Sequence, residues 1–399
     1  MFPATSLHLS QGDKKRLLLA LSIVLVGVFA FIQVYSIQSI LPEIRADLNA
    51  TVVEAGQAVG ITILAIALVA PFMGIVSDAL GRKWFITGSV FFLAVPTALM
   101  MLVEDVHSLL LLRFLQGLAV PGVSVVITAY IGEEFSGARM VRTMTLYVCG
   151  CIMGGFLGRF MIGHLTEYMS WREAYGVMAL FNLVGGVIIW RGLPASRCFK
   201  ANPNVHASLV TLRRLLHSRD LRVASLVGAT LLFSQIALFT YINLHLASAP
   251  YHYSPGNLAN LFTVYLLGMM VMPVMGYIIP RIGIRNAILL SLGLSMGAVA
   301  LTLVQPAWLI IVALALAACG TFIAQSAVMS FVAQRMTEGR SLANGLYYTV
   351  YYCGGFLGAW ACGLAYAWHA WPATVATLLL TQLAGWLVAW WYIPGPARP

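Results

Sequence analysis

The chain has 399 residues, of which 60% are hydrophobic and only 9% are charged, and its formal net charge is +10. A soluble domain has roughly 25% charged residues, so this chain lacks the charged surface that a soluble enzyme needs. Its basic residues lie in short segments between apolar runs, not on one face or tail, which argues against a nucleic-acid-binding protein. Lipid is therefore the expected environment of most of the chain.

Twelve apolar stretches have the length of about 20 residues that a membrane-spanning helix needs. In chain order they begin near Leu17, Val53, Trp84, Leu109, Met140, Ala174, Val223, Leu258, Ala287, Trp308, Leu342 and Thr374. The runs are too long and too unbroken for the alternating strands of a membrane barrel. We therefore predict an all-α membrane protein with twelve transmembrane helices.

The distribution of Lys and Arg orients these helices. If the N-terminus is cytoplasmic, 19 of the 23 Lys and Arg residues lie in cytoplasmic segments. Only Arg45 and Arg172 then lie outside, and Arg113 and Arg159 lie within predicted helices. The positive-inside rule thus predicts a multi-pass protein of a bacterial-type inner membrane with both termini in the cytoplasm.

An internal repeat divides the chain into two parts. The longest hydrophilic stretch, 193–220, separates the sixth predicted helix from the seventh. We expect a basic cytoplasmic linker there, between an N-terminal six-helix half, 1–192, and a C-terminal six-helix half, 221–399. The sequence Gly-Gly-Phe-Leu-Gly occurs at 154–158 and again, six helices later, at 354–358. Two pseudo-symmetric halves are therefore predicted, an arrangement that in transporters places the substrate between the halves.

Residues 74–83 read Gly-Ile-Val-Ser-Asp-Ala-Leu-Gly-Arg-Lys and lie between the second and third predicted helices. This segment resembles the Gly-x-x-x-Asp-x-x-Gly-Arg-Lys signature of the major facilitator superfamily, and residues 113–117 resemble that family's Arg-x-x-Gln-Gly motif. The resemblance covers the whole chain and implies a secondary transporter that works by alternating access. It also implies a conformational gate, in which we expect Arg82 to pair with an acid. The gate residues are Gly74, Asp78, Gly81, Arg82, Lys83, Glu133 and Glu134.

The fifth predicted helix carries glycines whose spacing resembles the drug:proton antiporter signature of this superfamily. Gly155 stands where that signature has Pro, and Arg159 replaces its last Gly. This variant is similar to the YnfM-like inner-membrane transporters. Glycine allows helices to approach closely, so we expect helix-packing contacts at Gly150, Gly154, Gly158, Gly354 and Gly358.

An ionisable side chain inside the membrane costs about 2.5 to 3.5 kcal/mol on insertion scales and is a functional candidate for that reason. For Arg113 and Arg159 two interpretations stay open. Each guanidinium either caps carbonyl groups or reaches the outer interface, or it forms a positive site that faces the cavity. Polar and aromatic residues on the helices that line the cavity in the superfamily complete the candidates for substrate binding or coupling. These are Arg113, Gln116, Arg159, Gln33, Gln38, Gln235, Tyr241, Gln325, Tyr347 and Tyr351, with Tyr35 as a further candidate.

The sequence has no nucleotide-binding, haem or hydrolase motif, and its six Cys and eight His show no metal-binding spacing. We therefore expect no enzyme activity, no cofactor and no metal, and a proton gradient as the energy source. The first hypothesis is proton-linked efflux of a small organic molecule by a monomer that lies in the lipid bilayer and binds no nucleic acid. The alternatives are an importer or facilitator of a small organic anion and, more remotely, a non-transporting membrane receptor. Since no Asp or Glu lies deep within a predicted helix, neutral or anionic amphiphiles are expected to be better substrates than permanent cations.

Overall fold

The computed structural model describes residues 11–196, 214–336 and 340–395, and every regular element in these ranges is helical. The first half contains α1 (Gln11–Ser36), η1 (Ile37–Ile40), α2 (Leu41–Asp47), α3 (Val52–Leu80), α4 (Arg82–Leu99), η2 (Met100–Leu102), α5 (Val106–Glu134), α6 (Gly137–Leu165) and α7 (Trp171–Gly192). The second half contains α9 (Arg219–Ala247), α10 (Pro255–Leu261), α11 (Val264–Ile282), α12 (Ile284–Leu301), α13 (Ala307–Arg335) and α14 (Arg340–Tyr392). The predicted all-α fold class is confirmed.

Ten helical segments in the described part of the chain are long and apolar enough to cross a membrane, against the twelve predicted. The long helix α14 counts as one segment, although its backbone is non-helical at His369 and Ala370, where the last two predicted helices meet. The 19-residue α11, which belongs to the eighth predicted helix, is not among the ten. The two differences change the number of segments but not the positions of the helices, which begin close to the predicted residues.

Two pairs of corresponding helices have the same length in both halves, and the same turn precedes one of these pairs. α4 and α12 have 18 residues each, and α5 and α13 have 29 each. A glycine with positive φ precedes each of the shorter helices, Gly81 at +85° and Gly283 at +83°. Glycine adopts this conformation at little steric cost. The turn of the predicted superfamily signature therefore recurs in the second half. The sequence of this second turn lacks the acidic residue that the signature has in the first half.

Glycines make the closest helix contacts within each half. Three glycines of α6 lie against the backbone of α1, and two glycines of α14 lie against the backbone of α9. At each of them a Cβ atom would fall on a carbonyl oxygen of the facing helix, so a larger residue would force the helices apart. The pairs are Gly150–Val24, Gly154–Val28, Gly158–Ile32, Gly354–Ala229 and Gly358–Phe233.

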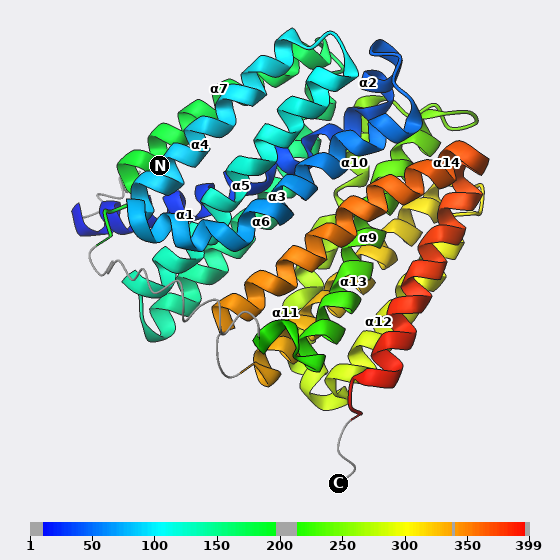
Figure 1. Ribbon diagram of the computed structural model, residues 1–399. Helices are drawn as coiled ribbons and strands as arrows, with labels where there is room; N and C mark the ends of the chain where they lie inside the picture. Colours follow the sequence, from blue (N-terminus) through cyan, green and yellow to red (C-terminus); the bar gives the residue numbers. More distant parts are fainter. Residues whose placement is uncertain (1–10, 197–213, 337–339, 396–399) are drawn as a thin grey trace, which may run out of the picture.

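The two halves form two helix bundles that lie side by side (Figure 1). We call the end at which α7 ends and α9 begins the linker end, and the opposite end, where α2 and α10 lie, the far end. Near the far end the halves touch, because Gly56 and Gly60 in the first turns of α3 face Ala359 of α14. Residues 197–213 of the predicted linker lie outside the described residues, and the domain boundaries and the sidedness of the ends stay predictions.

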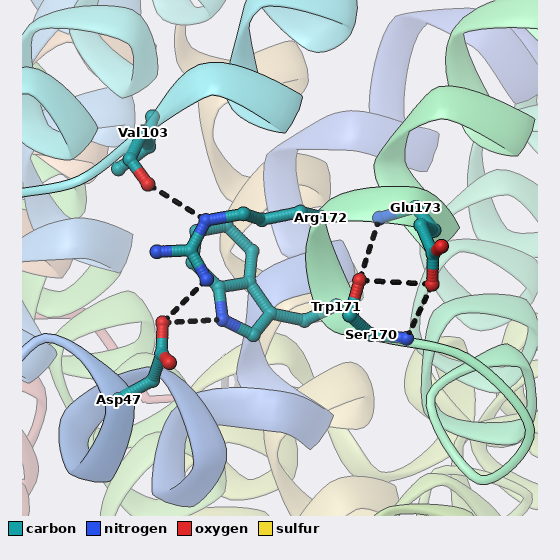
Figure 2. Close-up of polar contacts among 6 residues, drawn as sticks. All are labelled: Asp47, Val103, Ser170, Trp171, Arg172 and Glu173. Atoms are coloured by element: carbon teal, nitrogen blue, oxygen red, sulfur yellow. Dashed lines mark hydrogen bonds and ion pairs between the residues drawn. The ribbon is translucent and has the colours of Figure 1, made fainter.

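A polar cluster around Arg172 fastens the far end of the first half (Figure 2). The guanidinium donates to Asp47 Oδ2 (2.6 Å) and to the carbonyl oxygen of Val103 (2.7 Å), and it lies 4.4 Å from the centre of the Trp171 ring. The indole Nε1 of Trp171 donates to the same Asp47 oxygen (3.1 Å). The cluster thereby holds the end of α2 against the beginning of α7 and fixes the short segment that follows α1.

Candidate functional site

The candidate site lies where the first helix changes conformation. The α-helical backbone ends at Ser36, a 3₁₀ turn follows from Ile37 to Ile40, and α2 begins with Pro42 in its first turn. Backbone carbonyls at such a transition lose regular helical partners, and proline supplies no N–H. Side chains of other helices can then donate to these carbonyls. The two membrane-embedded arginines, Arg113 and Arg159, both approach this segment.

Arg113 of α5 is fully buried and is bonded within the first half. Its guanidinium donates to the carbonyl oxygens of Gln33 (2.7 Å), Val34 (2.5 Å) and Ala58 (2.8 Å). It also donates to Oε1 of Gln116 (2.6 Å). Of the two interpretations left open by the sequence, the geometry favours the one in which this arginine caps carbonyl groups, because its donors are used to hold α1 and α3 together.

Arg159 of α6 is only 2% exposed but lies where the two halves meet. Its Nε donates to Oε1 of Gln38 (2.7 Å), and its Nη1 donates to the carbonyl oxygen of Gly155 (2.7 Å). Three aromatic rings lie within cation–π distance of the guanidinium carbon. They are Tyr35 at 4.4 Å, Phe262 at 4.5 Å and Tyr265 at 4.8 Å. One ring comes from the first half and two come from the second, so we call these three residues the aromatic cage.

Gln38 connects Arg159 to the second half. While its Oε1 accepts from Arg159, its Nε2 donates to the hydroxyl of Thr240 in α9 (2.9 Å). The neighbouring Ser39 hydroxyl donates to the carbonyl oxygen of Arg159 (2.8 Å). Gln38, Ser39 and Thr240 are all buried. A continuous chain of side-chain hydrogen bonds thus runs from α6 through η1 to α9.

No ion pair to Arg159 occurs among the residues that the structure describes. Glu167, the acid that follows it most closely in sequence, is engaged elsewhere. Its Oε1 accepts from the hydroxyl of Ser254 (2.8 Å) and from the backbone N–H of Gly256 (3.2 Å), across the far end between the halves. The charge of Arg159 is therefore stabilised by amide and carbonyl oxygens and by aromatic rings.

The remaining candidates of the second half lie on α9, α13 and α14, where Tyr241 and Tyr347 are fully buried. The Tyr347 hydroxyl donates to Oε1 of Gln325 (3.1 Å), and the Tyr241 hydroxyl donates to the carbonyl oxygen of Ala359. Gln235, also on α9, is half-buried. Four tyrosine rings of α14 contact one another, partly stacked and partly edge to face, with centre-to-centre distances from 5.3 to 6.1 Å: Tyr347, Tyr348, Tyr351 and Tyr352.

The predicted gate residues with described side chains lie at the linker end of the first half. Arg82 binds Glu133 through two hydrogen bonds, Nη2 to Oε1 (2.6 Å) and Nε to Oε2 (3.2 Å). This pair joins α4 to α5 and does not cross between the halves. Lys83 is half-buried beside it, and Glu134 has a polar partner of its own. Gly74 and Asp78 fall in the part of α3 whose side chains lie outside the described residues, so their part in a gate stays a prediction.

Two features of this region escaped the sequence analysis. Phe262, Tyr265 and Thr240 were not candidates, because aromatic residues and threonine on apolar helices usually serve packing. Thr240 lies on the seventh predicted helix, which was expected to line the cavity, whereas Phe262 and Tyr265 lie on the eighth, for which no such expectation was made. Glu43 was assigned to a helix end, yet its Oε2 is buried and has no hydrogen-bond partner among the described residues. Gln33 was a candidate, and both of its amide atoms are buried without such a partner.

The chain was compared with known proteins. The model of the Major Facilitator Superfamily matches residues 23–359 and 246–399. The inner membrane transport protein YnfM of Escherichia coli is 28% identical over 94% of this chain and 91% of its own length. The chloramphenicol resistance protein CraA of Acinetobacter baumannii is 28% identical over 46% of this chain and 45% of its own.

Among solved structures, a bacterial homolog of the human lysosomal transporter Spinster, in an inward-facing and occupied conformation, has a similar fold. Its TM-score is 0.78 at 16% identity, and the match covers 97% of this chain and 100% of that one. At this identity the likeness concerns the fold alone. Together with the family match across nearly the whole chain, it agrees with the all-helical fold and its repeated turns. The chain belongs to the major facilitator superfamily and is a multi-pass membrane transporter, not an enzyme.

Proposed function

We propose that this transporter exports a small neutral or anionic organic molecule in exchange for protons, by alternating access. The observation that carries the proposal is the character of the region between the halves. Among the described residues there, tyrosines from both halves and the amide of Gln38 surround one charged group, Arg159, and no carboxylate pairs with it. A permanent cation would have to lose its water beside a like charge, which is costly, whereas a neutral or anionic molecule would not.

Efflux is the proposed direction for two reasons. The α6 glycines that pack on α1 have a spacing that resembles the antiporter signature. CraA, which by its name confers resistance to a drug, is similar to nearly half of the chain.

Glu43 is the proposed proton-binding residue. Its Oε2 is buried without a hydrogen-bond partner among the described residues. An unpaired buried charge is costly, so gain and loss of a proton at this position would change how α2 packs at the far end. The carboxyl group lies four residues after Ser39, which donates to the carbonyl oxygen of Arg159.

The test is a flux assay in proteoliposomes with and without an imposed pH gradient. Chloramphenicol, benzoate and ethidium serve as a neutral, an anionic and a permanently cationic probe. We expect gradient-driven, saturable movement of chloramphenicol or benzoate and little movement of ethidium. Robust transport of ethidium would contradict the proposal. So would a flux that is unaffected by the pH gradient for all three probes.

A second candidate function, import or facilitated passage of an organic anion, is favoured by the buried charge of Arg159 alone. The same proteoliposomes separate it from efflux. An importer moves benzoate in the direction of the proton gradient and a facilitator moves it without one, whereas an exporter moves it against the direction of the protons.

A further inference from the structure

Two buried arginines in the first half differ in how completely they are hydrogen-bonded. Arg113 donates four hydrogen bonds, three to carbonyl oxygens and one to an amide oxygen. Arg159 donates two, from Nε and Nη1, and its Nη2 donates none to a described residue. Aromatic rings stabilise a cation but do not accept its N–H groups as an oxygen does. Arg159 therefore has N–H groups without an acceptor among the described residues, although its side chain is almost as deeply buried as that of Arg113.

The protein supplies no anion for these donors from the helices that face them. No Asp or Glu occurs between Asp220 and Glu338, so α9, α10, α11 and α13 have no carboxylate beyond the first turn of α9. In the first half, Asp47 binds Arg172 and Glu167 binds Ser254, and neither pairs with Arg159. A buried cation that is paired only with neutral groups is an uncommon and costly arrangement.

We propose that Arg159 binds the anionic group of the transported molecule, a carboxylate or a group of similar shape, and that this anion replaces Gln38 on the guanidinium. A guanidinium holds a carboxylate with two parallel hydrogen bonds, which are shorter and stronger than its bond to a neutral amide. The aromatic cage supplies apolar surface for the rest of the molecule. This inference rests on the proposed transport function for the identity of the ligand as cargo.

Displacement of Gln38 has a consequence for the contact between the halves. The same amide that accepts from Arg159 donates to Thr240 of the second half. When an anion takes its place on the guanidinium, the amide loses the bond that orients it, and the link to Thr240 weakens. Binding of the anionic group would thereby loosen one of the polar connections between α9 and the first half. Neutral molecules lack this effect.

The experiment measures binding to the purified full chain in detergent micelles, without a membrane or a gradient. Acetate, benzoate and 2-naphthoate are titrated by calorimetry, each beside its matching amide, so that charge varies while shape does not. We expect at least one carboxylate to bind tenfold or more tightly than its amide. Arg159→Gln lowers the affinity for that carboxylate to the level of the amide, and Arg159→Lys leaves an intermediate affinity because it keeps the charge but loses the fork.

Two further variants separate this role from a structural one. Arg142→Gln removes an exposed arginine of α6 and leaves carboxylate affinity unchanged, which excludes an effect of net charge. Thr240→Val removes the acceptor that holds Gln38 and raises carboxylate affinity about threefold, because the amide is then displaced more easily. A purely structural Arg159 would show no such gain.

The inference would be overturned if the unmodified protein bound every carboxylate and its amide equally. It would also be overturned if folded Arg159→Gln kept the carboxylate affinity of the unmodified protein. If the Gln variant does not fold, unchanged carboxylate affinity in folded Arg159→Lys would have the same meaning. The outcome is independent of the flux assay. Protein that binds carboxylates but moves no probe in proteoliposomes would refute the proposed function and leave this inference standing. Gradient-driven flux without carboxylate binding would refute this inference and leave the proposed function standing.

Discussion

Replacement of Arg113 with glutamine tests whether this arginine holds the first half together. The side chain is fully buried and bonds to Gln33, Val34, Ala58 and Gln116. The shorter glutamine cannot reach the carbonyl oxygens of both α1 and α3. Interhelical hydrogen bonds in membranes average about 0.6 kcal/mol, so the three bonds to α1 and α3 set a lower value of about 2 kcal/mol. At about 1.5 kcal/mol for a bond to a charged group, the four together reach about 6 kcal/mol.

Two considerations place the expected loss between these values. Removal of a buried charge also removes its desolvation cost, which offsets part of the lost hydrogen bonding. The carbonyl oxygens that remain are buried and unpaired on one side, which adds to the loss. We therefore expect Arg113→Gln to lower the free energy of unfolding by about 3 kcal/mol.

The assay is denaturation in mixed micelles followed by circular dichroism, with transport rates expressed per folded protein. Arg172→Gln is the matched control, because its side chain is 28% exposed and its carboxylate partner Asp47 is 43% exposed. Such a pair contributes about 1 kcal/mol or less. Equal losses in the two variants, or a normally stable Arg113→Gln protein that has lost only transport, would refute the structural interpretation of Arg113.

Three further substitutions have definite expected outcomes. Glu133→Gln removes the carboxylate of Glu133 from Arg82, whose side chain is 7% exposed, and should lower the free energy of unfolding by about 2 kcal/mol in the same titration; no change would mean that other partners hold Arg82. Gly81→Ala should cost about 1 kcal/mol or more because φ is +85°, whereas Gly88→Ala, inside the helix that Gly81 precedes and with nothing within 4 Å of an added Cβ, should be neutral or stabilising; the reverse order would show the turn to be adaptable. Glu43→Gln should abolish the response of flux to a pH gradient while carboxylate binding to the purified protein persists, and an unchanged pH response would exclude Glu43 as the proton-binding residue.

Features that depend on the spacing of residues within one helix or turn could be predicted from the sequence. Glycines at intervals of four residues lie on one side of a helix, so Gly150, Gly154 and Gly158 indicated a close helix contact, although not its partner. The turn at Gly81 could be identified because only a few residue types suit a tight turn before a helix. Helix positions followed from the length of the apolar runs, since the bilayer fixes that length.

Features that depend on distant parts of the chain were not open to prediction in this way. Arg113 and Arg159 look equivalent in sequence, each a single charge in an apolar run. The structure distinguishes them because the last turn of α1 presents backbone carbonyls to Arg113, whereas the 3₁₀ turn that follows presents a side-chain amide to Arg159. Phe262 and Tyr265 lie about a hundred positions from Arg159, and nothing local marks an aromatic residue on an apolar helix as part of a cage.

The glycine contacts between α1 and α6, and between α9 and α14, have a mechanical consequence. Backbone lies directly on backbone at these five positions, so there are no side-chain rotamers there that could rearrange. The two helices of each pair should then move together as one rigid body. A change in tilt between the halves would have to be absorbed where side chains fill the space, and the aromatic cage, with rings from both sides of that boundary, is such a place. The protein would thus confine its deformation to the neighbourhood of Arg159, whose Nη2 donates to no described residue.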